Sequence, residues 1–154
     1  MAALPGRKAS DDMAAEISAT CLLTRTRQIS RVLTALYDQE MRAHGVLSSQ
    51  FSLLVLIHAL GPISRAELGR RNHQDRSTLT RNLQPLLSQG WVREDAAEAG
   101  GRRRPLQVTP AGRKQLRRSA PAWSAAQAKA RSLLGDAGTL ALMGIAGELP
   151  RRAT

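Results

Sequence analysis

The sequence predicts a mainly α-helical chain that carries one small β-hairpin. Apolar side chains recur with a helical period over most of the chain. Two short runs of strand-forming residues flank a turn that contains Gly100-Gly101. A length of 154 residues with 42% apolar and 23% charged residues fits one globular domain rather than a disordered chain. Side chains able to cap helices stand at the expected starts of four helices: Ser48 or Ser49, Ser64, Asp75 and Thr109.

The N-terminal part is expected to be a loose tail followed by two helices. Residues 1–12 mix Pro, Gly, Ser and charged side chains, which is typical of a flexible tail. A helix is predicted from about Met13 to His44, because apolar residues share one of its faces, and Gly45 ends it. The next helix extends to Gly61-Pro62 and is apolar nearly all round, so we expect it to be buried.

Two short helices joined by a turn are predicted next. Ser64 and Glu67 form a capping-box pattern, in which each side chain takes a free backbone N–H at the start of a helix ending near Arg71. After a three-residue turn, Asp75 is expected to cap a second helix that runs to about Ser88. Two helices with this spacing are a candidate helix-turn-helix.

A β-hairpin is predicted to follow, with strands Trp91–Asp95 and Leu106–Thr109. Its loop carries Arg102, Arg103 and Arg104, and no acidic residue lies at its tip. Three guanidinium groups after a glycine pair suit insertion into a narrow, electronegative minor groove. We therefore interpret these arginines as DNA contacts; the alternative is an ordinary solvated loop.

The chain is expected to end in helices. Thr109 caps the first of them, with Pro110 at its first position. This helix runs towards Leu134, and Pro121 either kinks or interrupts it. A short last helix is predicted at about residues 137–149.

The charge distribution narrows the class of function. The chain has 23 basic and 12 acidic residues, a formal net charge of +11. Residues 63–118 hold thirteen basic and five acidic groups, whereas both flanks are nearly neutral. This pattern indicates a central module that binds a polyanion such as nucleic acid. The sequence contains no paired acid and base, nucleophile motif or phosphate loop, so we do not expect an enzyme.

The predicted helix after Asp75 has one apolar and one polar face. Projected at 100° per residue, four leucines share the side expected to face the core. The opposite side presents hydroxyl, amide and guanidinium groups, which can read base edges in the major groove; an ordinary solvated face is the alternative. Besides the hairpin arginines, the predicted DNA contacts are Ser64, Arg76, Ser77, Thr78, Thr80, Arg81 and Gln84.

These motifs together resemble a known family. Ser77-Thr78-Leu79-Thr80-Arg81, then Gly90-Trp91-Val92, an arginine-rich turn and Val108-Thr109-Pro110-Ala111-Gly112 are similar to the winged helix-turn-helix of MarR-type transcriptional regulators. The resemblance covers about residues 15–148. In family members an Asp commonly stands two residues before the wing arginine and holds it. Here Gly100 takes that position and Arg102 is the wing arginine, so the resemblance implies a wing that DNA must order.

The resemblance also implies an assembly and partners. It assigns residues 48–109 to a winged helix-turn-helix domain that binds double-stranded DNA, and residues 13–47 and 110–154 to intertwined dimerisation helices. The implied function is a homodimeric regulator, a repressor on a pseudo-palindromic operator, which a small aromatic or anionic effector releases. The alternatives are a redox-responsive repressor that senses through Cys21 and a non-specific architectural nucleic-acid-binding protein.

Three residues are candidates for effector binding. Arg25 lies on the apolar stripe of the first helix, where it receives a ligand carboxylate, pairs with a carboxylate such as Glu40 of the partner subunit, or extends its charge to solvent. His58 is more often a hydrogen-bonded core histidine than a ligand contact. Tyr37 is either a core residue or a hydroxyl donor.

The single cysteine, Cys21, excludes an internal disulfide and fits a reducing compartment. Some family members sense peroxides through a first-helix cysteine, but Cys21 is about two residues out of step with that position, and a packed, inert thiol is favoured. Cys21 and the three histidines lack metal-ligand spacing, so no metal or cofactor is expected. The longest apolar run, Leu53–Leu60, is too short to span a membrane and no signal peptide is visible, so a cytoplasmic protein is expected.

Overall fold

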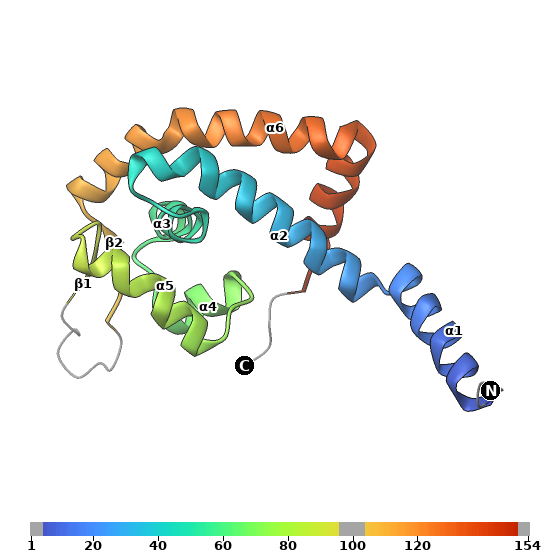
Figure 1. Cartoon of the computed structure of the whole chain (residues 1–154). Helices are drawn as coiled ribbons and strands as arrows, with labels where there is room; N and C mark the ends of the chain where they lie inside the picture. The colour runs from blue at the N-terminus through green and yellow to red at the C-terminus, as the bar shows by residue number, and fades with distance from the viewer. Residues whose placement is uncertain (1–4, 96–103, 151–154) are drawn as a thin grey trace. The chain divides into compact units, whose positions relative to one another are not determined.

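The computed structural model describes residues 5–95 and 104–150. They belong to two compact units, Met1–Ala35 and Leu36–Thr154. The predicted class, mainly α-helical with a two-stranded hairpin, is confirmed (Figure 1). In chain order the elements are α1 (Pro5–Thr20), α2 (Leu22–Met41), the short 3-10 helix η1 (Arg42–His44), α3 (Ser48–Leu60), α4 (Arg65–Arg71), α5 (Arg76–Ser88), β1 (Val92–Glu94), β2 (Leu106–Val108) and α6 (Pro110–Glu148).

The first unit differs from the sequence prediction at two places. A loose tail was expected over residues 1–12, but α1 begins at Pro5. Proline suits the first position of a helix, because its φ is preset and its missing N–H needs no partner there. The single helix predicted from Met13 to His44 is instead two helices, α1 and α2, separated by a break at Cys21.

Arg25 stabilises this break. Its guanidinium donates hydrogen bonds to the backbone oxygens of Ser18 (3.1 Å) and Ala19 (3.3 Å) and to Oε1 of Gln28 (3.0 Å). The last carbonyls of a helix lack amide donors from their own helix. Arg25 supplies donors to two such carbonyls at the end of α1, and its charge is favourable there because of the helix dipole.

The core of the second unit gathers around α3, which contacts α5, β2 and α6. The predicted burial of this helix is confirmed for Leu53, Leu54 and Ile57, which are at most 1% exposed. The leucine face predicted for α5 also lies in this core. Its buried members are Leu53, Leu54, Ile57, Ile63, Leu68, Leu79, Leu83, Leu86, Val92 and Leu106.

Three predicted helix caps are confirmed, and one is wrong. The α3 helix is not capped by Ser48 or Ser49. Instead the N–H of Ser48 donates to Oδ1 of Asp38 (2.6 Å), and the N–H of Leu47 donates to Oε1 of Gln50 (3.1 Å). The confirmed caps accept from the N–H three residues on: Ser64 from Glu67 (3.2 Å), Asp75 from Thr78 (2.8 Å) and Thr109 from Gly112 (3.1 Å).

The hairpin is confirmed, with shorter strands than predicted. β1 and β2 pair antiparallel, with Val92 opposite Val108 and Glu94 opposite Leu106. Ile63, just before α4, forms an additional antiparallel bridge to Leu106. The hairpin is therefore joined to the chain that enters the helix-turn-helix.

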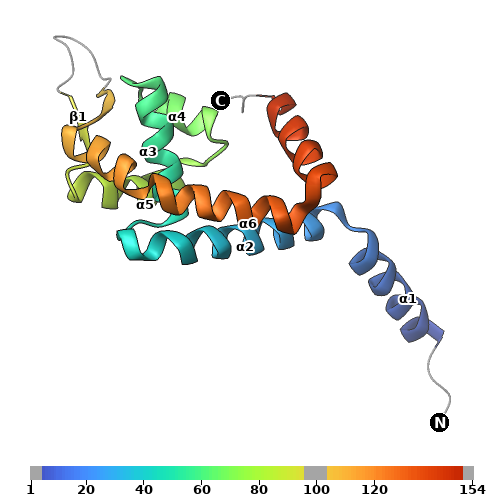
Figure 2. The same ribbon diagram turned by 90° about the horizontal axis from the view of Figure 1, so that it is seen from above.

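The last helix continues through Pro121 and is interrupted at Gly135 instead. Gly135 has φ of 68° and ψ of 172°, a conformation that side-chain-bearing residues rarely adopt. The chain turns there (Figures 1 and 2), and the final helical segment matches the short helix predicted at about 137–149.

The C-terminal end of α2 packs alongside α6 (Figure 2). The hydroxyl of Tyr37 donates to Oε1 of Gln127, and Nζ of Lys129 lies 2.5 Å from Oε1 of Glu40. In the described residues no single helix is both long and apolar enough to cross a membrane, although Leu22–His44 and Ser48–Leu60 together pass by length and composition.

Candidate nucleic-acid interface

The polar face of α5 is exposed opposite its buried leucines. Arg76, Ser77, Thr80, Arg81 and Gln84 are all exposed, while Leu79, Leu83 and Leu86 are at most 3% exposed. The helix register predicted from the sequence is therefore confirmed. Two other predicted contacts, Thr78 and the α4 cap Ser64, are half-buried.

The hydroxyl groups on this face already have acceptors within the chain. Ser77 and Thr78 both donate to the Asp75 carboxylate, at 2.7 and 2.9 Å, and Thr80 donates to the backbone oxygen of Arg76 at 2.8 Å. The hydrogen bonds from the Ser77 hydroxyl and from the N–H and hydroxyl of Thr78 hold the pKa of Asp75 well below its usual range. The three hydroxyl protons are thus already donated within the chain, whereas a phosphate or the O6 and N7 edge of guanine needs a hydrogen-bond donor.

Two exposed side chains on α5, Arg81 and Gln84, still offer hydrogen-bond donors. Arg81 and Gln84 are three residues apart, so they lie side by side on the helix surface. One Arg81 nitrogen, Nη2, lies 3.4 Å from Oγ1 of Thr78, which leaves the rest of the guanidinium available. Arginine suits O6 and N7 of guanine, and glutamine suits adenine.

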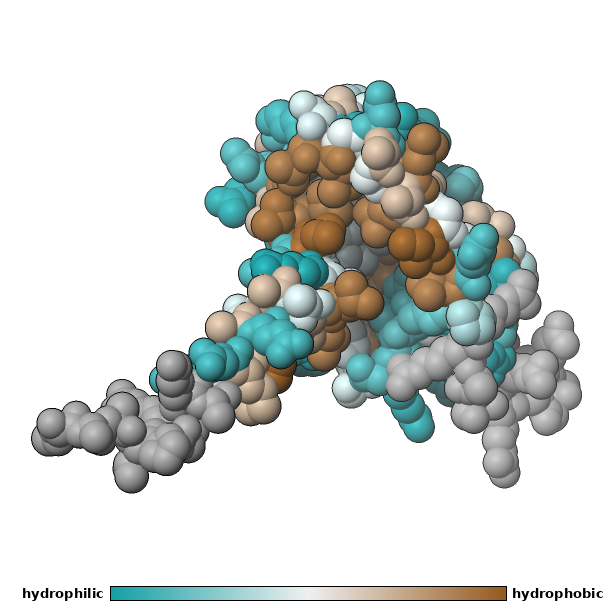
Figure 3. Space-filling model, turned by 90° about the vertical axis from the view of Figure 1, so that its right-hand side faces the viewer, coloured by the Kyte–Doolittle hydropathy of each residue, from teal (hydrophilic) through white to brown (hydrophobic). Residues whose placement is uncertain are grey.

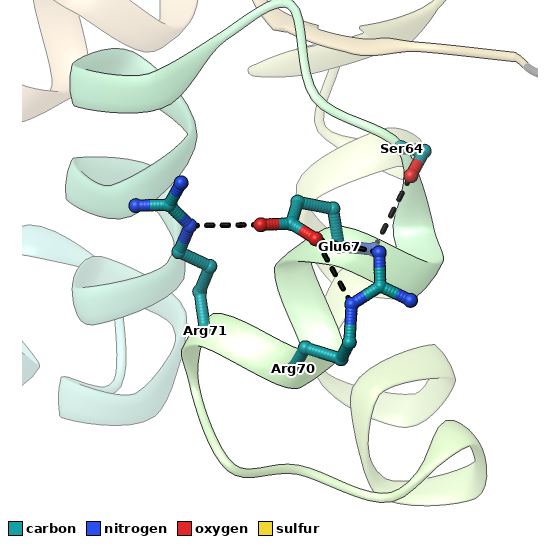
Figure 4. Close-up of polar contacts among 4 residues, drawn as sticks. All are labelled: Ser64, Glu67, Arg70 and Arg71. Atoms are coloured by element: carbon teal, nitrogen blue, oxygen red, sulfur yellow. Dashed lines mark hydrogen bonds and ion pairs between the residues drawn. The ribbon is translucent and has the colours of Figure 1, made fainter. Parts of the chain in front are cut away.

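A basic cluster on α4 was not predicted from the sequence. Glu67 accepts from Nε (2.9 Å) and Nη2 (2.5 Å) of Arg70 and from Nε of Arg71 (2.9 Å), and Ser64 caps the same turn (Figure 4). These bonds hold the pKa of Glu67 below its usual range. The predicted capping box is therefore only half correct, because the Glu67 carboxylate binds arginines rather than reaching back. The spacing of three and four residues was the available signal.

Of the three loop arginines predicted to contact DNA, the structure describes one. Arg104 is exposed just before β2, whereas Arg102, Arg103 and Gly100 lie outside the described residues. At the loop end of the paired strands, Nε of Arg65 lies 2.5 Å from Oε1 of Glu94. This ion pair joins residues 29 positions apart, and no local sequence pattern indicates it.

Two of the three effector candidates, Tyr37 and His58, do not share a site. Tyr37 is half-buried against Gln127 of α6, and burial raises the pKa of its hydroxyl. His58 and Arg113 instead line a small open cavity of about 190 Å³ beside β2. Gln127 and Arg113 are 14 residues apart on α6, which separates the two places by about 20 Å.

His58 is exposed, so the core histidine favoured by the sequence is wrong. The physical reason is that α3 has a solvent face despite its apolar sequence: Val55 is 43% exposed, and Ser52 and Ala59 are also exposed. The guanidinium of Arg25, in the first unit, donates to backbone oxygens at the end of α1.

Cys21 lies at the break between α1 and α2 and is half-buried. The side chain and the backbone of Thr24 both hydrogen-bond to its thiol, which lowers the pKa of Cys21 below its usual value. Within the part of the chain that the structure describes, no group of three or more His, Cys, Asp or Glu residues is placed to hold a metal ion.

The interface falls within a region that matches a known family model. Residues 44–104 match the model of the MarR family. The chain is also 33% identical to the transcriptional regulator MosR of Mycobacterium tuberculosis, over 83% of this chain and 96% of MosR, with a TM-score of 0.67. This chain belongs to the MarR family. A second MosR structure, solved in complex with DNA, aligns at 31% identity over 84% of this chain and all of that one, with a TM-score of 0.66.

Two further proteins resemble this MarR-family chain at lower sequence identity. One is the uncharacterised HTH-type transcriptional regulator YwoH of Bacillus subtilis, 26% identical over 77 residues. That match covers 50% of this chain and 56% of YwoH, so the chain spans just over half the length of this relative. The MarR-family protein Rv2887 of M. tuberculosis, solved with salicylic acid, has the same fold at 21% identity over 85% of this chain and 97% of that one, with a TM-score of 0.64.

Proposed function

We propose that this MarR-family regulator binds double-stranded DNA sequence-specifically as a homodimer and represses transcription until a small molecule releases it. The observation that carries the proposal is the exposed Arg81–Gln84 face of α5, opposite a buried leucine face. A segment with a net charge of +8, residues 63–118, surrounds this face. The solved complex of MosR with DNA supports DNA as the partner.

In the proposed complex α5 lies in the major groove. Arg81 and Gln84 contact base edges, and the N-terminal ends of α4 and α5 face phosphates, where backbone N–H groups and Arg76 add attraction. Ser77, Thr78 and Thr80 hold the start of α5 through their bonds to Asp75 and the backbone. The wing, residues 92–108 with Arg102, Arg103 and Arg104, contacts the minor groove of the same half-site.

Selection of bound duplexes from a random DNA pool tests this proposal. A homodimer with two reading heads is expected to enrich a pseudo-palindrome whose half-sites are separated by about 10 base pairs, or by a multiple of one helical turn. Recovery of duplexes without a shared sequence, at any salt concentration that allows binding, would contradict sequence-specific recognition.

Arg104→Ala is expected to weaken binding to selected and random duplexes by similar factors. A wing arginine reads groove shape and phosphate charge rather than a base pattern. Removing one phosphate contact per protomer should flatten the slope of log K against log salt by about one unit per contact, or about two units per dimer. Fluorescence titrations at four salt concentrations measure the slope. Arg131→Ala removes the same charge from α6 as a control, and an equal change in its slope would refute a wing-specific role.

The homodimer is supported by apolar side chains that are exposed at the end of α6. Leu140 is 74% exposed, Met143 65% and Ile145 63%. Figure 3 views the side of the molecule that carries this segment, and brown apolar side chains are exposed on it. A second copy of the chain would remove this surface from water.

We expect the double variant Leu140→Asp, Ile145→Asp to be monomeric. The native protein should have about twice the chain mass of 16.7 kDa by light scattering at micromolar concentration, and the variant one chain mass. Burial of two carboxylates in an apolar interface costs more than the interface gains there. Ala111→Asp, in the first turn of α6, is the control with an added charge. A native protein that is monomeric and still binds the selected DNA would overturn the homodimer.

The proposed effector is a small aromatic or anionic acid, because Rv2887 has been solved with salicylic acid. Salicylate is therefore the first probe in a DNA-release titration. Tyr37 of α2 and His58 of α3 lie beside different parts of α6, so Tyr37→Phe and His58→Ala should not have the same effect on release. Release that neither variant alters would exclude both residues as effector contacts.

A further inference from the structure

We infer that Glu94 and Arg65 form a positioning pair that fixes the orientation of the wing relative to the helix-turn-helix and thereby sets DNA specificity. Neither residue needs to touch a base. The inference rests on the proposed function, since it concerns how the wing and α5 reach one DNA site together.

The backbone places the two residues on either side of β2. Leu106 of β2 lies opposite Glu94 of β1 in the hairpin register. On its other side Leu106 exchanges two hydrogen bonds with Ile63, N–H to O at 2.8 and 3.2 Å. Ile63, Leu106 and Glu94 therefore form one row across the sheet, and Leu106 in the middle is fully buried.

An ion pair between Arg65 and Glu94 links the two ends of this row. Arg65 follows Ile63 by two residues and is the first residue of α4. Its Nε donates to Oε1 of Glu94 at 2.5 Å, and the two side chains are 38% and 23% exposed. The pair thus ties β1, the outer strand of the wing, directly to the start of α4. Because α4 packs against α5, the wing is held relative to the base-reading helix as well.

A second cation acts on the same carboxylate. The hydrogen bond from Arg65 is the main reason that the pKa of Glu94 lies below its usual range, and the charges of Arg65 and Arg104 add to this effect. Glu94 is therefore ionised at neutral pH and attracts one arginine from the helix-turn-helix and one from the wing.

This arrangement gives a specific signature when the carboxylate is neutralised. Without the charge of Glu94, Arg65 and Arg104 are free to bind the phosphates of DNA of any sequence. Affinity for random DNA should therefore stay the same or rise. The wing is then no longer held in one orientation relative to α5. Affinity for a specific DNA site, which both must contact together, should therefore fall. A purely structural role would instead lower binding to all DNA in step with the folded fraction.

The test compares a duplex selected by the native protein with a scrambled duplex of the same composition, at one salt concentration. For Glu94→Gln the selected-to-scrambled affinity ratio should fall roughly fivefold, and affinity for the scrambled duplex should not fall. The charge swap Arg65→Glu with Glu94→Arg should bring the ratio back to within about twofold of native, since glutamate also suits the first turn of α4. Arg65→Gln is the second single variant, and it should lower the ratio too.

Asp95→Asn is the matched control. Asp95 is the next residue along the hairpin, but its carboxylate pairs with Arg93 of β1 at 2.9 Å. Its loss should therefore leave the affinity ratio unchanged. Melting curves of all variants establish the folded fraction at the temperature of the titrations.

The outcomes separate the positioning role from the proposed function. A native protein with an affinity ratio near one would refute sequence-specific binding itself. A native ratio that both Glu94→Gln and Arg65→Gln leave intact would overturn the positioning role alone. A charge swap that restores melting but not the ratio would overturn it as well.

Discussion

Arg81→Ala is expected to weaken binding to the selected duplex by about 1–3 kcal/mol, roughly 5- to 150-fold, and to relax the preference at one base pair of each half-site. Arg81 is exposed on α5, opposite a leucine face that fixes the orientation of the helix in the core. Its guanidinium keeps free donors that can hydrogen-bond O6 and N7 of guanine. Titrations against a panel of duplexes with single base-pair changes measure both effects.

Thr80→Ala is the informative comparison on the same face. The Thr80 hydroxyl donates to the backbone oxygen of Arg76, so its loss should change affinity and base preference much less than the loss of Arg81. A variant Arg81→Ala that keeps the native preference at every base pair would show that α5 enters the groove in a different register.

Gly112→Ala is expected to destabilise the chain by about 1–3 kcal/mol or more. A Cβ at this position would lie 2.1 Å from the backbone oxygen of Trp91 and 2.8 Å from Cγ1 of Val108. The Trp91 oxygen cannot simply move away, because it accepts the N–H of Thr109 at 3.0 Å. The first turn of α6 would have to move off the hairpin, so the melting temperature and DNA affinity should fall together.

Gly138→Ala provides the matched control in the same helix. A Cβ there would meet only the Cβ of Leu134, at an ordinary contact distance of 3.5 Å. Alanine in a helix interior gains about 0.5–1 kcal/mol over glycine, so this variant should be as stable as the native chain or more so. Urea unfolding of both variants decides the matter. An unfolding midpoint for Gly112→Ala equal to the native one would contradict the close approach of α6 to the hairpin.

Local signals predicted those parts of the fold that depend on neighbouring residues. Ser64, Asp75 and Thr109 each accept the N–H three residues on, so short sequence patterns were sufficient to place the starts of α4, α5 and α6. The leucine period likewise fixed which side of α5 is buried and which carries Arg81. The exposed polar face of α5 could therefore be predicted largely from the sequence.

Contacts between residues distant in the sequence could not be predicted in this way. Asp38, ten positions before Ser48, takes the place expected for a serine cap of α3. Glu94 and Arg65 are 29 positions apart. Both pairs exist because the fold brings separate segments together, and a period or a capping pattern carries no information about such pairing.

Periodicity also failed where one pattern fits two structures. The apolar period over residues 13–44 continues across Cys21, but Arg25 can satisfy the carbonyls at the end of α1, and two helices result. In α3 the apolar residues are spread around the helix, which obscured the face that exposes Val55 and His58.

The ratio of affinities for the selected duplex and for a scrambled duplex, measured with the native protein at one salt concentration, tests the central claim most directly. A sequence-specific regulator that reads bases through α5 should give a ratio of about 10³ or more. A ratio near one, with both affinities falling equally as salt increases, would contradict specific recognition and would indicate that the net charge of +11 alone binds DNA.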